Sequence, residues 1–130
     1  MKLTTPVTIE PLERRLGFDD RFFFTGSCFA DSIGAIMAES GFDVTVNPFG
    51  VLYNPASVAQ SLNRLHSREK FTEADVIMSE GRFTSFHHHS RFDRPSAAEF
   101  LSDANAALEE AADRFAAATV CVVTLGTSGV

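Results

Sequence analysis

Three short apolar runs, each followed by Gly, Ser, Thr or Asn residues, limit what this chain can fold into. The runs are residues 22–25, 42–46 and 120–125. Continuous apolar runs of this length are typical of strands buried in a parallel sheet. Patterns with helical periodicity separate them. The alternation predicts an α/β fold with a parallel sheet covered by helices.

The first helix is expected directly after the first apolar run. Phe29, Ile33, Ile36 and Met37 recur at helical spacing, and Gly41 is a typical residue just after a helix end. We therefore expect these four apolar side chains to form the face that packs on the sheet.

Two further helices have clear start signals. Asn54 before Pro55 provides an N-cap and a proline at the first helical position, and Ser96 and Glu99 have capping-box spacing. Between them, residues 72–75 suit a short helix, and residues 77–92 suit a hairpin or an excursion outside the main sheet. The expected core positions of the two longer helices are Val58, Leu62, Leu65, Phe100, Leu101, Ala104, Leu108, Ala111 and Phe115.

Composition narrows the class of protein and its partners. The 130 residues suit one domain, 1–130, and the net charge of −6 disfavours a nucleic-acid partner. No apolar stretch suits a signal peptide or a membrane span, which predicts a cytoplasmic protein without a membrane partner. Cys28 and Cys121 are expected to be reduced, with Cys28 packed beneath a turn.

Ser27 is the candidate functional residue that geometry alone suggests. In a parallel sheet the carboxyl ends of the strands meet at one edge, where ligand sites form. Ser27, residues 47–54 and residues 126–129 would share that edge. Ser27 would also open a helix, where free N–H groups favour an oxyanion. Two interpretations remain open: Ser27 is a nucleophile, or it merely caps its helix.

Four motifs add a family resemblance. The stretches "GSCFAD", "NPFGVLYNP", "FHHHSRF" and "VVTLGT" resemble, in order and over nearly the whole chain, the GSCFA domain family. That family looks like a branch of the SGNH/GDSL hydrolases, which are serine esterases. The resemblance implies a three-layer α/β/α fold with a flavodoxin-like parallel sheet.

The resemblance also implies roles for individual residues. Ser27 matches the nucleophile, and the N–H groups of Ser27 and Gly50 match oxyanion donors. The usual third donor, an asparagine, is absent, and either Thr127 or the nearby backbone is the candidate to replace it. His89 matches a family position and becomes a candidate substrate-binding residue.

Other polar residues near this edge suit binding and offer no metal site. Asn47 and Asn54 are also candidate substrate-binding residues, although either could simply stabilise the loop. Neighbouring histidines on a strand alternate between faces, so the run 87–89 lacks the ligand spacing of a zinc site. We expect no metal and no cofactor.

The sequence lacks the late Asp-x-x-His block that holds the catalytic base in the wider superfamily. A serine without a base is a weak nucleophile. The chain is therefore expected to be the N-terminal part of a longer domain, inactive alone, with an exposed sheet edge that could support oligomers. The alternative is that the base comes from elsewhere, with the histidines of the run 87–89 as the local candidates. The expected function is an esterase for acyl esters of small molecules or glycans. The alternative is a non-catalytic domain that binds a ligand or a partner.

Overall fold

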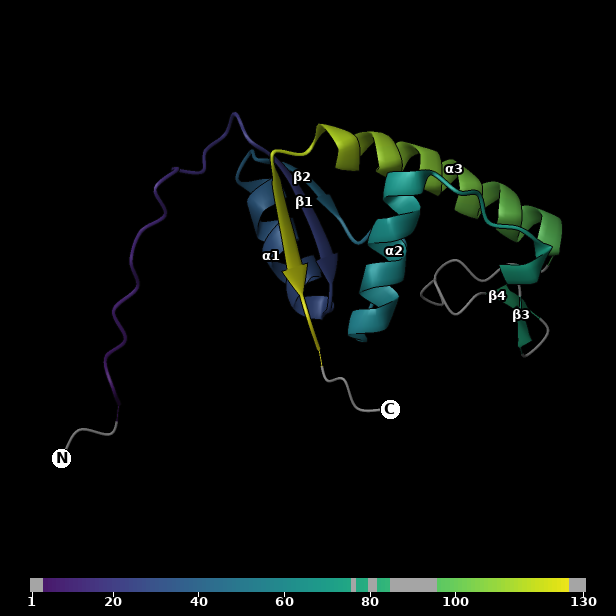
Figure 1. Cartoon of the computed structure of the whole chain (residues 1–130), viewed down its shortest axis with the longest axis horizontal. Helices are drawn as coiled ribbons and strands as arrows, with labels where there is room; N and C mark the ends of the chain where they lie inside the picture. The colour runs from purple at the N-terminus through teal and green to yellow at the C-terminus, as the bar shows by residue number, and fades with distance from the viewer. Residues whose placement is uncertain (1–3, 76, 80–81, 85–95, 127–130) are drawn as a thin grey trace.

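The structure is a computed structural model that describes residues 4–75, 77–79, 82–84 and 96–126. Along the chain it contains the following elements: β1 (Arg21–Gly26), α1 (Cys28–Glu39), β2 (Asp43–Val46), α2 (Pro55–Ser67), the short 3₁₀ helix η1 (Glu73–Asp75), β3 (Ile77–Ser79), β4 (Arg82–Thr84), α3 (Ala97–Ala117) and β5 (Val120–Thr124). Figure 1 shows their arrangement.

The main sheet has the strand order β2-β1-β5, and both pairs are parallel. Phe22 of β1 pairs with Val44 of β2 and with Val120 of β5. The predicted α/β class and the parallel sheet are confirmed. Because all three strands run in one direction, their carboxyl ends lie at the same edge, as Figure 1 shows.

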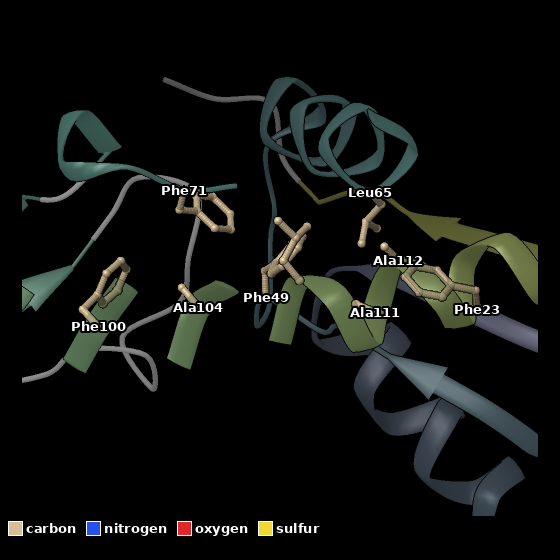
Figure 2. Close-up of a cluster of buried hydrophobic side chains, with 9 residues drawn as sticks. Phe23, Phe49, Leu65, Phe71, Phe100, Ala104, Ala111 and Ala112 are labelled. Atoms are coloured by element: carbon tan, nitrogen blue, oxygen red, sulfur yellow. The ribbon is translucent and has the colours of Figure 1, made fainter. Parts of the chain in front are cut away.

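Helices cover both faces of the sheet, and the three consecutive phenylalanines of β1 explain how. Side chains alternate along a strand, so Phe22 and Phe24 pack with α1, while Phe23 packs with α2 and α3. Figure 2 shows the cluster that contains Phe23, in which Phe49 and Phe71 extend the core away from the sheet. Although the run is uniformly apolar in sequence, its alternate side chains therefore belong to two separate hydrophobic clusters.

The start signals of α2 and α3 are confirmed. The Asn54 side chain accepts a hydrogen bond from the Ala56 N–H at 2.7 Å, and the Ser96 side chain accepts one from the Glu99 N–H at 3.1 Å. The expected core positions on these helices are either buried or packed against the core. The buried ones are Val58, Leu65, Phe100, Ala104, Leu108 and Ala111, and those packed against the core are Leu62, Leu101 and Phe115.

The predicted packing face of α1 is partly wrong. Phe29 and Ile36 are exposed, whereas Ala30 and Gly34 are the buried residues of this helix. A Cβ atom on Gly34 would overlap the side chain of Val46. Small residues therefore face the sheet where the helix lies close to β2. Ile33 and Met37 pack beside them against the cluster of Phe22, Phe24 and Ala30, as expected.

The segments outside the sheet differ in how firmly they pack. β3 and β4 form a separate antiparallel pair beside α3, as expected for an excursion from the main sheet. The N-terminal arm, residues 4–16, runs away from the body in Figure 1, and its Val7, Ile9 and Leu12 side chains are exposed. Across the described ranges, no helix combines the length and the apolar character needed to cross a membrane.

Candidate functional site at the carboxyl edge of the sheet

Backbone hydrogen bonds join three segments at the carboxyl edge, namely residues 26–31, 47–54 and 124–126. The Leu52 N–H donates to the Gly26 carbonyl at 2.8 Å, and the Gly126 N–H donates to the Tyr53 carbonyl at 3.2 Å. The Ser27 N–H donates to the Thr124 carbonyl at 3.1 Å. The loop after β2 thus bridges the ends of β1 and β5. We call these three segments the Ser27 edge.

Gly26 shapes the turn that delivers Ser27 to this edge. Its φ of +136° lies in a region that other residues rarely adopt. A Cβ atom there would overlap the Thr124 carbonyl oxygen. Glycine is therefore required both by the backbone conformation and by the close approach of β5.

Asn47 holds this turn from the other side. Its Oδ1 accepts the Gly26 N–H at 2.8 Å, its Nδ2 donates to Asp31 Oδ1 at 2.6 Å, and its own N–H donates to the Phe24 carbonyl at 2.9 Å. The side chain is fully buried, and its φ of 42° is left-handed, which asparagine tolerates. Asn47 is thus a structural clamp that ties β1, α1 and the loop together.

Ser27 occupies the N-cap position of α1, but its hydroxyl does not cap the helix. The Ser27 Oγ instead lies 3.0 Å from Thr124 Oγ1, at hydrogen-bonding distance. The residue is 8% exposed. Within the described ranges no histidine or carboxylate is hydrogen-bonded to Ser27 Oγ. The hydroxyl of Ser27 is therefore held at the edge by a second hydroxyl group, that of Thr124.

The two N–H groups matched to oxyanion donors are engaged within the protein. The Ser27 N–H donates to the Thr124 carbonyl and also to Thr124 Oγ1 at 3.0 Å, and the Gly50 N–H donates to the Asn47 carbonyl at 2.8 Å. An oxyanion at this edge would have to displace these acceptors. Preformed donors that point at developing charge are what oxyanion stabilisation requires, so the turn would need to rearrange.

The remaining predicted site residues have different locations. Asn54 lies on the bridging loop, and its side chain caps the start of α2. Thr127 and His89 lie outside the described residues. Ser27, Asn47 and Gly50 are thus brought together by the three segments, while Asn54 lies beside them with a local role.

Two side chains at the Ser27 edge were missed or misplaced by sequence reasoning. Cys28 is exposed rather than packed beneath the turn, because the first turn of α1 presents it outward. Tyr53 is 51% exposed. Hydrogen bonding to Cys28 is the main factor that raises the pKa of the Tyr53 phenol, and the charge of Cys28, burial and the Asp31 carboxylate add to it. The signal in the sequence that could have pointed to Tyr53 is that it is the one tyrosine of the chain and lies in a loop that follows a strand.

Thr124 was also missed, although it makes the contact that places Ser27. The only signal in the sequence was a polar residue, Thr124, near the end of an otherwise apolar strand. As for metals, the part of the chain that the structure describes contains no group of three or more His, Cys, Asp or Glu side chains able to hold an ion.

Comparison with known proteins identifies the family. The model of the GSCFA family matches residues 21–130, so the match begins at the first residue of β1 and includes all three segments of the Ser27 edge. Neither the curated proteins nor the solved structures gave a match. The chain belongs to the GSCFA family.

Proposed function

We propose that the Ser27 edge is the site of an SGNH-type serine hydrolase that acts on acyl esters of small molecules or glycans. One observation carries the proposal: the Ser27 hydroxyl opens a helix at the carboxyl ends of three parallel strands, yet it faces Thr124 instead of capping that helix. Serines at N-cap positions normally bond to their own helix. A hydroxyl held away from the helix is available for another role.

The proposed chemistry assigns Ser27 Oγ as the nucleophile. It would attack the ester carbonyl, form an acyl-enzyme and release the alcohol, and water would then release the acid. The N–H groups of Ser27 and Gly50 would hold the oxyanion after their present acceptors move aside, with Thr127 as the candidate third donor. Asn47 acts by positioning the turn. The proton on Ser27 needs a base, and His89 is the candidate within this chain.

Labelling with a fluorophosphonate probe tests the nucleophile. We compare the unchanged chain with Ser27→Ala and with Ser96→Ala, a serine whose side chain does cap its helix. Each reaction is run with and without added imidazole, which supplies a base in solution. We expect labelling that imidazole increases, that Ser27→Ala abolishes and that Ser96→Ala retains.

Two outcomes of the same labelling experiment would contradict the proposal. Equal labelling of the Ser27→Ala variant places the reactive group elsewhere. No labelling of the folded chain, even with imidazole, favours the non-catalytic binding domain. If labelling without imidazole is lost in His89→Ala, the base lies in this chain.

A separate proposal concerns self-association through β5. Within the described residues β5 pairs only with β1, and the side chains of Val123 in β5 and of Leu125 just after it are exposed. An unpaired apolar edge strand is a template for pairing with another chain. We expect concentration-dependent dimers in sedimentation experiments, which Val123→Lys should weaken. A monomer at all concentrations would contradict this.

A further inference from the structure

Tyr53 is a half-exposed aromatic side chain at the Ser27 edge, and the proposed reaction does not use it. Its main chain and its ring both contact Gly126, two residues after the end of β5. The Tyr53 carbonyl accepts the Gly126 N–H at 3.2 Å. A Cβ atom on Gly126 would lie 2.9 Å from Cδ1 of the ring. The ring is therefore seated against Gly126, where only glycine leaves it room.

The other end of the side chain reaches the start of α1. The phenol lies close enough to Cys28, the residue that directly follows Ser27, for Cys28 to raise the pKa of Tyr53. The Tyr53 side chain thus lies against Gly126 and near Cys28, the first residue of α1. The residue as a whole is 51% exposed, so the Tyr53 side chain is not enclosed by its neighbours.

The charge of the Ser27 edge limits what can lie on this ring. Residues 26–31, 47–54 and 124–126 contain no Lys, Arg or His, and Asp31 is their only charged residue. Asp31 is close enough to act electrostatically on the Tyr53 phenol. A negatively charged substituent beside the Tyr53 ring would face the Asp31 carboxylate and would find no Lys, Arg or His among these residues to pair with.

We infer that Tyr53 is a specificity-determining residue that stacks on an uncharged six-membered ring, aryl or pyranosyl, of an ester held beside Ser27. An aromatic face supplies a large apolar contact with a preferred geometry. The inference rests on the proposed function, because it names the substrate class of the same site. It adds that the ring, and not only the ester group, is recognised.

Tyr53 also provides the means of testing this. The chain has one tyrosine and no tryptophan, so its tyrosine fluorescence reports Tyr53 alone. We measure acrylamide quenching of that fluorescence in Ser27→Ala, which prevents turnover, with four esters. Phenyl acetate and a monoacetylated methyl pyranoside carry neutral rings, hexyl acetate has no ring, and 4-acetoxybenzoate is an anion.

We expect both neutral ring esters, or one of them, to protect Tyr53 from quenching, and the tighter ligand identifies an aryl or a pyranosyl substrate. Hexyl acetate and the anion should give at least about threefold weaker binding. No protection by either ring ester, or equal protection by hexyl acetate, would overturn the inference.

Variants place the contact on the ring. By calorimetry, Tyr53→Ala should weaken binding of the ring ester roughly three- to tenfold, the range of an aromatic stacking contact. Tyr53→Phe keeps the ring and should bind within about twofold of the parent. Phe18→Ala is the matched control, since Phe18 is also exposed but stacks on Phe42 ahead of β2. A Tyr53→Ala variant that is folded by circular dichroism and binds normally would overturn the inference.

The outcome is separable from that of the proposed function. Protection of Tyr53 by a ring ester without Ser27 labelling would leave a binding site and remove the hydrolase. Ser27 labelling without any effect of Tyr53 variants would leave the hydrolase and remove the ring contact.

Discussion

Two asparagines of the loop after β2 differ in the reach of their side-chain hydrogen bonds: that of Asn54 is local, and those of Asn47 join distant parts of the chain. Asn54 bonds the N–H of Ala56, two residues further along the chain. Asn47 bonds Gly26 and Asp31, which precede it by 21 and 16 residues. The first contact stabilises the start of one helix, and the second holds together the turn that carries Ser27. The difference shows that the same residue type serves either local or tertiary structure, depending on what the fold brings to it.

The strongest disruption of the Asn47 network should come from Gly26→Ala. The new methyl group would overlap the Thr124 carbonyl oxygen, and φ of +136° is strained for alanine. We expect a loss of about 3 kcal/mol or more in the free energy of unfolding, measured in urea. Gly17→Ala is the control, since a Cβ atom there meets nothing within 4 Å. Equal losses in the two variants would contradict the role of the close approach.

Asn47→Ala should cost about 2–3 kcal/mol, because it leaves the buried Gly26 N–H unpaired and removes the donor to Asp31. Asn47→Gly separates the causes. Glycine accepts φ of 42° without strain but lacks the side chain, so a similar loss in both variants assigns the effect to the hydrogen bonds. Urea unfolding of both proteins measures this. A loss below 1 kcal/mol in Asn47→Ala would contradict the clamp.

Asn54→Ala should cost only about 1 kcal/mol, the usual value of an N-cap, and Asn54→Gly a few tenths. Thermal unfolding followed by circular dichroism measures both. The comparison with Asn47 fails if Asn54→Ala is the more destabilising change, or if it alters the fluorophosphonate labelling of Ser27.

The smallest effect should be a pH dependence at the opposite end of the strands. Hydrogen bonds from the Gly17 N–H and from Thr119, and the nearby Arg14, lower the pKa of Asp20 despite its burial. The folded state therefore binds this proton less readily than the unfolded state. The resulting stability is present above the ordinary carboxyl pKa, about 4, and is lost as pH falls through the lower folded pKa.

Acid unfolding followed by circular dichroism checks this sign. Asp20→Asn should flatten the decline in stability below about pH 4 relative to the parent chain. An unchanged slope would show that Asp20 does not contribute to the acid sensitivity.

Local signals in the sequence were sufficient for the helix starts and for the strands. The Asn54 and Ser96 caps join residues two and three positions apart, so the local sequence is sufficient to predict them. The parallel direction of the strands followed from the alternation of strands and helices. The packing face of α1 did not, because it depends on how closely Gly34 approaches Val46 on a different element.

The sequence by itself determined that small and polar residues would gather at the carboxyl edge, since the strand pattern fixes where parallel strands end. Only the tertiary structure decided what each residue does there. It directs the Ser27 hydroxyl to Thr124, gives Asn47 its buried partners and seats the Tyr53 ring on Gly126. Thr124 and Ser27 are 97 residues apart, and the pairing of β1 with β5 is what brings them to 3.0 Å. Spacing along a chain cannot encode such a contact, because it forms only when separate strands pair.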